Sequence, residues 1–114
     1  MAEQDFEVRE HSHAELEVIS VVGEIDLATA PQLRTVLDRV LDAGAVSLIV
    51  DLSGTTFIDS TALGVLIGAW KRTQNEGRSM SVVASDPRIL RVFEITGLTD
   101  LFPLHGTLDE AMAS

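Results

Sequence analysis

Hydrophobic and polar residues alternate in two stretches near the start of the chain. These stretches cover residues 6–10 and 16–22, and such alternation predicts two half-buried β-strands. The polar segment between them, residues 11–15, predicts a hairpin turn, and residues 23–26 are expected to end the second strand.

The period then changes to that of a helix. Thr29 and Gln32 have the spacing of a capping box, and Pro31 is tolerated in a first helical turn. Gly44 stands where left-handed backbone commonly ends a helix. The apolar positions between these limits repeat at i, i+3, i+4 and i+7 and so share one buried face. They are Leu33, Val36, Leu37, Val40 and Leu41.

The middle of the chain predicts a strand, a loop and a second helix. Residues 46–52 form a short apolar run with Asp51 inside it, which is typical of a central strand. Residues 53–56 predict a loop, and the second helix is expected to begin near Ser60. The apolar face of this helix holds Leu63, Leu66, Ile67 and Trp70.

The last third of the chain continues the alternation of strands and helices. Gly77 is expected to end the second helix, and residues 79–84 predict a strand. Asp86 and Pro87 are typical of a helix start, and Gly97 of a helix end. The inner face of this third helix is expected to hold Leu90 and Phe93. The remaining elements are a short edge strand at 101–104 and a terminal helix that begins at 107–110, where capping-box spacing recurs.

This order predicts an α/β fold. Strands that alternate with helices favour parallel pairs joined by right-handed crossovers, and the opening hairpin makes the sheet mixed. The expected architecture is a single domain over residues 1–114, with a core of about 5–112, a mixed β-sheet with an N-terminal hairpin, and about four helices.

Composition narrows the classes of partner. The formal net charge is −10, which disfavours direct binding to nucleic acid or to anionic lipid. The absence of cysteine excludes disulfides, thiol catalysis and thiolate metal sites. The apolar stretches are too short to span a membrane, and the acidic N-terminus does not resemble a signal peptide. We therefore expect a cytoplasmic protein without a membrane partner.

Ser60 is the strongest candidate for a functional residue. It follows Asp59 at the expected start of an apolar helix, where unpaired amides and the positive end of the helix dipole favour an anion. A phosphate on Ser60 would find these groups. The alternative is that Ser60 is an ordinary N-cap, because serine is a preferred capping residue.

Other polar and small residues have two interpretations each. Gly64 and Gly68 lie four residues apart inside the second helix, where they serve either close packing within the fold or close approach of a partner. The carboxylates Asp26, Asp51 and Asp59 either hold a magnesium ion or act as caps and turn residues. His11 and His13 are expected in a solvated turn rather than at a metal.

Enzyme motifs are missing around these residues. The chain has no phosphate-binding loop of the GxxxxGK type and no GxSxG nucleophile elbow. No histidine is near Ser60 in the sequence, so hydrolase chemistry has little support.

Three segments resemble the STAS domain family, and within it the stand-alone bacterial anti-sigma factor antagonists. They are residues 23–31 (GEIDLATAP), 51–64 (DLSGTTFIDSTALG) and 86–98 (DPRILRVFEITGL), so the resemblance covers nearly the whole chain. The second segment is similar to the family's phosphorylation loop and is the most specific. One departure is Ala62, where family members usually carry glycine.

The resemblance implies a partner-switching cycle. The unphosphorylated antagonist binds an anti-sigma factor that is also a serine kinase, which frees a sigma factor. The kinase then phosphorylates the antagonist at the position of Ser60, and a serine phosphatase reverses this. The implied partner-binding residues are Asp26, Asp59, Thr61, Ala62, Leu63 and Gly64.

In such a cycle the chain is not itself an enzyme and needs no cofactor or metal, because the kinase supplies ATP, magnesium and base. Two alternatives remain open. The chain could be a STAS accessory subunit of a lipid ABC transporter or sensory assembly, or a small nucleotide-binding domain.

Overall fold

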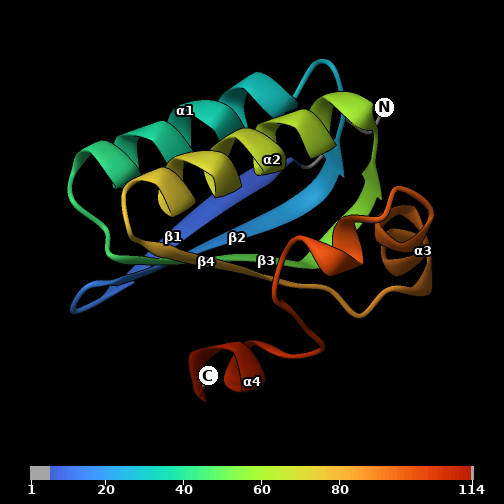
Figure 1. The fold of residues 1–114 in the computed structure, drawn as a ribbon. Helices are drawn as coiled ribbons and strands as arrows, with labels where there is room; N and C mark the ends of the chain where they lie inside the picture. Colours follow the sequence, from blue (N-terminus) through green and yellow to red (C-terminus); the bar gives the residue numbers. More distant parts are fainter. Residues whose placement is uncertain (1–5, 114) are drawn as a thin grey trace.

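The structure is a computed structural model that describes residues 6–113. A five-stranded sheet carries α1 and α2 side by side on one face, and α4 lies against the other (Figure 1). The elements in chain order are β1 (Glu7–His13), β2 (Leu16–Ile25), α1 (Ala30–Asp42), β3 (Ser47–Ile58), α2 (Ser60–Asn75), β4 (Ser79–Val83), α3 (Pro87–Ile95), a 3₁₀ turn (Leu98–Asp100), β5 (Leu104–His105) and α4 (Leu108–Ala113).

The sheet is mixed, as predicted. Its strands follow the order β1-β2-β3-β4-β5, with β1 antiparallel to β2 and every other neighbouring pair parallel. The single α/β domain, the N-terminal hairpin and the four helices are confirmed. The expected lower limit of the domain core, residue 5, lies outside the described residues.

The hairpin turn is shorter than predicted. β1 continues to His13, and the turn consists of Ala14 and Glu15, with Ala14 at a φ of +57°. His11 lies opposite Val18 and His13 opposite Leu16, so both histidines belong to the strand and not to the turn. Polar residues are tolerated there because β1 is an edge strand with exposed side chains.

The loop predicted at residues 53–56 is wrong, because these residues belong to β3. Thr55 is buried and its hydroxyl donates to the Val21 carbonyl at 2.9 Å. A Cβ at Gly54 would lie 3.1 Å from the Val22 side chain, which explains a glycine at this close approach. The last residue of β3 that pairs with β4 is Asp51, so β3 projects beyond β4 toward the start of α2.

The main core lies between the sheet and the layer of α1 and α2. The predicted face of α1 is confirmed: four of its five residues are buried, and Val36 is half-buried against the core. On α3, Ile89 and Phe93 are buried, whereas the predicted Leu90 is only half-buried. The predicted strand at 101–104 is also partly wrong, because Phe102 is buried outside any strand and β5 begins at Leu104.

Trp70 joins α2 to the C-terminal segment. It is half-buried against the core, and its ring meets Phe102 edge-on with centroids 5.7 Å apart. Phe102 in turn meets Phe93 at 6.0 Å. The prediction that Trp70 is at least partly buried is therefore confirmed.

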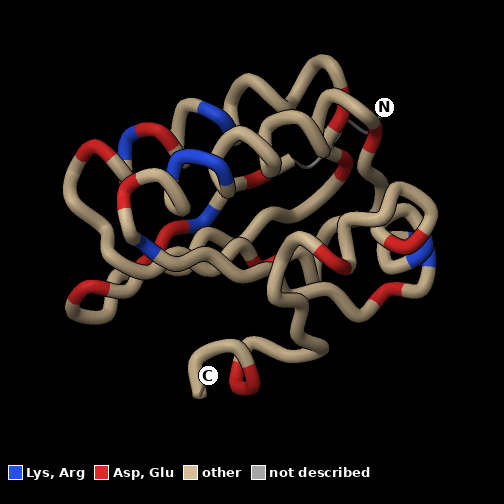
Figure 2. Tube along the Cα trace, viewed as in Figure 1, with Lys and Arg blue, Asp and Glu red and all other residues tan. Residues whose placement is uncertain are grey.

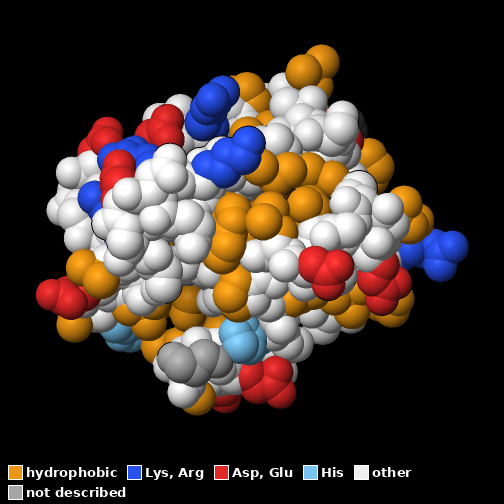
Figure 3. Space-filling model, in the orientation of Figure 1, with side chains coloured by type: hydrophobic (Ala, Val, Ile, Leu, Met, Phe, Trp, Pro, Cys, Tyr) orange, Lys and Arg blue, Asp and Glu red, His pale blue; other side chains and the backbone are white. Residues whose placement is uncertain are grey.

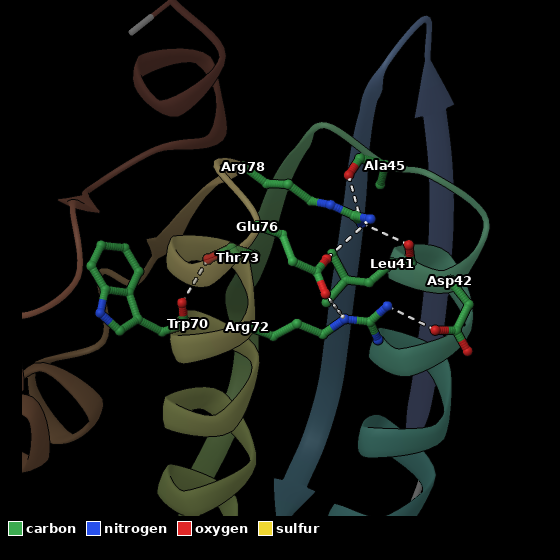
Figure 4. A network of polar contacts seen from close by, with 8 residues as sticks. All are labelled: Leu41, Asp42, Ala45, Trp70, Arg72, Thr73, Glu76 and Arg78. Atoms are coloured by element: carbon green, nitrogen blue, oxygen red, sulfur yellow. Dashed lines mark hydrogen bonds and ion pairs between the residues drawn. The ribbon is translucent and has the colours of Figure 1, made fainter.

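A polar network ties the end of α2 to the end of α1 (Figure 4). Arg78 donates to the carbonyl oxygens of Leu41 and Ala45 at 2.6 and 3.0 Å, and pairs with Glu76. Arg72 bonds Asp42 at 2.8 Å. Leu41 lies in the last turn of α1, where its carbonyl also accepts the Gly44 amide at 3.1 Å, and Ala45 follows the helix. Arg78 therefore caps the end of α1 and the turn after it from a distant part of the chain.

Arg78→Ala is expected to lower the free energy of unfolding by about 2 kcal/mol, since it leaves carbonyls at the end of α1 without their charged donor. Arg78→Lys should recover part of this loss, because one ammonium group cannot reproduce the fork of a guanidinium. Urea unfolding followed by circular dichroism measures both. The matched control is Arg91→Ala, an exposed arginine on α3, for which a change below about 0.5 kcal/mol is expected.

No helix in residues 6–113 is both long and apolar enough to cross a membrane.

Candidate functional site

The candidate site lies where β2 and β3 leave the sheet. Ile25 is paired with Ile58, and the Asp59 amide donates to the Ile25 carbonyl at 3.3 Å. Asp26 directly follows β2 and Asp59 directly follows β3, so the two residues lie side by side at the edge where α1 and α2 begin. Acidic residues gather at this edge, whereas the basic residues of α1 and α2 lie further along the helices (Figure 2).

Ser60 is exposed and is the first residue of α2. The interpretation of Ser60 as an N-cap is wrong, because Asp59 takes that position and its carboxylate accepts the Ala62 amide at 3.0 Å. Thr61 is half-buried in the same turn and does not cap the helix either. With the cap supplied by Asp59, the Ser60 hydroxyl is left at the positive end of the helix dipole, facing solvent.

Asp26 is held by the loop that leads into α1. Its Oδ1 atom accepts the amides of Ala28 and Thr29 at 2.9 and 3.1 Å, and the Thr29 hydroxyl lies at 3.1 Å. These bonds, led by that of the Thr29 amide, lower the pKa of the Asp26 carboxyl from its usual value. Within the described residues, Oδ2 of Asp26 accepts no hydrogen bond, so the carboxylate is oriented, charged and open to an external donor.

The predicted capping box at Thr29 is wrong, because Thr29 makes no side-chain cap bond. Its hydroxyl instead accepts the Asp26 amide at 2.9 Å and donates to the Glu24 carbonyl at 2.7 Å. Thr29 thus positions Asp26. The signal for this role was present in the chain as the spacing Asp-x-x-Thr, in which both side chains can bond nearby backbone.

The other predicted partner-binding residues divide by burial. Ala62 and Leu63 are 0% and 7% exposed and fix the first turn of α2 against the core. Gly64 is exposed, as is Gly68 one turn later. A Cβ at either glycine would meet no atom within 4 Å, so the packing explanation for the two glycines is wrong. Close approach of a partner stays a hypothesis for them.

The carboxylates do not assemble into a magnesium site. In residues 6–113 there is no group of three or more acidic or histidine side chains that could hold a metal ion. Asp51 lies in mid-strand, where it accepts the Ser53 hydroxyl at 2.6 Å and lies 3.4 Å from the Ser20 hydroxyl. It is not with Asp26 and Asp59, because β3 continues for seven residues after it.

Two exposed hydrophobic residues at this edge were not singled out from the sequence. Leu27, directly after Asp26, is 74% exposed, and Phe57, near the end of β3, is 47% exposed. The available signal was a large apolar residue inside a polar turn or at the end of a strand, where the fold does not require one.

Comparisons with known proteins agree on one family. The model of the STAS domain matches residues 5–111. The "Anti-sigma-B factor antagonist" of Listeria monocytogenes serovar 1/2a is 33% identical over 104 residues, which cover 91% of this chain and 90% of the relative. The protein of the same name from Bacillus subtilis (strain 168) is 36% identical over 86 residues, covering 75% of this chain and 78% of that relative.

Among solved structures, an anti-sigma factor antagonist from Mycobacterium paratuberculosis superimposes with a TM-score of 0.89 at 34% identity, over 96% of this chain and 92% of the other. The similarity therefore extends over nearly the whole fold, including the edge with Asp26 and Ser60. This chain belongs to the STAS domain family.

Proposed function

We propose that this protein is an anti-sigma factor antagonist that binds a serine-kinase anti-sigma factor when unphosphorylated, frees a sigma factor, and is switched off by phosphorylation at Ser60. The observation that carries the proposal is an exposed Ser60 hydroxyl at the start of α2, with Asp59 as the cap and Asp26 oriented beside it. Asp26, Asp59 and Gly64 belong to the proposed partner surface, with Thr61, Ala62 and Leu63 in the turn that supports it.

The names of the relatives support this proposal over the two alternatives. The two relatives from Listeria and Bacillus match this chain over 90% and 78% of their own length, and both are called anti-sigma-B factor antagonists. The proposal also fits a chain without catalytic machinery, because the kinase provides ATP, magnesium and base for phosphoryl transfer. The substrate has only to present a positioned hydroxyl.

The position of Ser60 suits a reversible phosphate. Of the first four amides of α2, Asp59 accepts those of Ala62 and Leu63, which leaves the amides of Ser60 and Thr61. A phosphate there gains from these donors and from the helix dipole, which offsets repulsion by the Asp59 carboxylate. The same exposure gives a phosphatase access to the modified residue.

The test is to incubate the purified protein with each kinase anti-sigma factor of the source organism and ATP, and then to map the phosphate. We expect stoichiometric modification of Ser60 by at least one kinase and none in Ser60→Ala. In Thr61→Ala the phosphate should still map to Ser60, which distinguishes the two neighbouring hydroxyls. The matched control is Ser79→Ala, an exposed serine at the start of β4, which should be modified like the wild type. Phosphate mapped to another residue, with Ser60 untouched, would contradict the proposal.

Asp26 variants separate charge from loop geometry. Asp26→Asn keeps an oxygen that can accept the Ala28 and Thr29 amides but removes the charge, so we expect near-normal thermal stability and about tenfold weaker binding to the kinase. Asp26→Ala removes both and should also lower the melting temperature. Because the pKa of Asp26 is lowered, the charge persists throughout neutral and mildly acidic pH, and the loop bonds it supports weaken only as pH falls through that lowered pKa.

Calorimetric titration with the kinase and a thermal scan measure the two effects. If Asp26→Asn binds like the wild type, the charge of Asp26 has no part in the interface.

A further inference from the structure

The end of the molecule that carries Ser60 exposes three large hydrophobic side chains. Leu27 is 74% exposed, Ile95 70% and Phe57 47%. Single exposed hydrophobic residues are common on protein surfaces, but a group of them around one site indicates an interaction surface. Burying a leucine or isoleucine side chain contributes about 1.5–3 kcal/mol, so the folded protein leaves this free energy available to a partner.

The sheet register and the packing of α3 bring these residues to one edge. Leu27 directly follows Asp26, and Phe57 lies opposite Glu24 in the pairing of β2 with β3. Ile95 is the last residue of α3, which packs against β3. Figure 1 shows α3 beside the rising end of β3, where α2 begins, and Figure 3 shows hydrophobic side chains along this margin of the molecule.

Leu27 is presented by a rigid loop. The loop residues on either side of it are bonded to each other through the Asp26 carboxylate and the Thr29 hydroxyl, at 2.7 to 3.1 Å. These bonds need nothing from the Leu27 side chain, so the fold would accept a polar residue there. A loop backbone that is already ordered before binding loses little entropy on binding, which favours a strong contact at Leu27.

Ile95 is also dispensable to the fold. The face of α3 that enters the core holds Ile89 and Phe93, at 1% and 0% exposure. Ile95 points away from that face, and the helix is capped by Asp86 at its start and followed by the left-handed Gly97. The exposed isoleucine therefore contributes to the surface rather than to the stability of α3.

Carboxylates accompany each of the three hydrophobic residues. Glu24 lies opposite Phe57, Asp26 precedes Leu27 and Glu94 precedes Ile95. The surface thus combines apolar contacts with negative charge, and it fits a partner that presents apolar pockets with a rim of lysine or arginine.

We infer that Leu27, Phe57 and Ile95 are the apolar anchors by which the anti-sigma factor is held around Ser60. This inference rests on the function proposed above and assigns the binding energy to residues that take no part in phosphoryl transfer. It also explains how one modification releases the partner. The anchors bring apolar surface of the partner over Ser60 and leave its basic residues at the rim. A phosphate on Ser60 would therefore lose its hydration when the interface closes without gaining a cationic partner in exchange.

The experiment measures the affinity of unphosphorylated variants for the purified kinase anti-sigma factors of the source organism, by calorimetric titration. Leu27→Ser and Ile95→Ser should each bind about 10- to 30-fold more weakly than the wild type, as expected of central apolar contacts. In the kinase assay both should raise KM and leave kcat unchanged. Val46→Ser is the matched control. Val46 is 45% exposed just before β3, at the other end of that strand from Phe57. The affinity of this variant for the kinase should stay within about twofold of that of the wild type.

Leu27→Met and Ile95→Met complete the set, because they keep an apolar side chain of similar size and should retain affinity within about threefold of the wild type. If the methionine variants lose as much affinity as the serine variants, or if Leu27→Ser and Ile95→Ser bind like the wild type, the anchors are wrongly assigned while the proposed function stands. If the wild type itself neither binds any of the kinases nor is phosphorylated by them, the proposed function is wrong and the anchors fall with it. Thermal scans of all variants should coincide, since the altered side chains are exposed.

Discussion

Phosphorylation of Ser60 is expected to weaken binding to the anti-sigma factor about a hundredfold and to leave the fold unchanged. The modification adds about −1.5 to −2 charges and three acceptor oxygens. In the free protein these oxygens are solvated and meet the amides at the start of α2, so the free energy of unfolding should change little. In the complex the same dianion must be desolvated beside Asp26 and Asp59, and a difference of about 3 kcal/mol corresponds to the hundredfold loss.

Variants of Ser60 separate the loss of the hydroxyl group from the addition of negative charge. Ser60→Ala should bind the kinase like the wild type and stay bound when ATP is added. Ser60→Asp carries less charge and fewer oxygens than a phosphate, so its affinity should fall between those of the two wild-type forms. The decisive measurement is calorimetric titration of the kinase with the wild type before and after stoichiometric phosphorylation. Equal affinities would end the switch hypothesis.

The fold was predictable wherever hydrophobic periodicity was continuous. The buried face of α1 and the alternation of β2 could be read directly, because each pattern repeats over several turns or pairs. The C-terminal half of β3 could not. Residues 53–56 are polar and include a glycine, and they form a strand because pairing with β2 satisfies their backbone. That pairing depends on a segment some thirty residues earlier and leaves no local signal.

The site was predictable in position but not in the roles of individual residues. Asp59 and Ser60 are both good capping residues, and the sequence does not choose between them. The choice is made by tertiary structure, because the bond from the Asp59 amide to the Ile25 carbonyl keeps Asp59 in extended backbone, and the helix then begins at Ser60. At α1 the same competition is resolved by Asp26 and Thr29, which bond each other across the loop.

The two glycines of α2 show another limit of prediction from sequence. Sequence alone leaves open whether Gly64 and Gly68 serve packing or a partner, because both interpretations need a small residue on one helix face. The structure removes the packing interpretation, since a Cβ at either position would meet open space. Two exposed glycines that weaken a helix by roughly 1 kcal/mol each, with no internal gain, are consistent with selection at an interface.

The second large effect is expected at Trp70, in the C-terminal half of α2. Trp70→Ala should lower the free energy of unfolding by about 3 kcal/mol, because it removes a half-buried indole and its edge-on contact with Phe102. For a domain of this size, whose total stability is about 5–15 kcal/mol, this is a large fraction. The loss should appear in urea unfolding followed by circular dichroism. In the wild type, the fluorescence of Trp70 should be shifted to the blue of fully hydrated indole.

The matched variant is Trp70→Phe, which keeps an aromatic ring against Phe102 and should lose only about 1 kcal/mol. Binding to the kinase should be unchanged in Trp70→Phe, because Trp70 lies on α2 more than two helical turns beyond Ser60 and a phenylalanine there keeps the ring contact with Phe102, which in turn packs on Phe93 of α3. The contact between α2 and Phe102 would then stabilise the domain without taking part in the switch. A Trp70→Ala variant as stable as the wild type, or a Trp70→Phe variant that binds more weakly at unchanged stability, would contradict this separation between Trp70 and the start of α2.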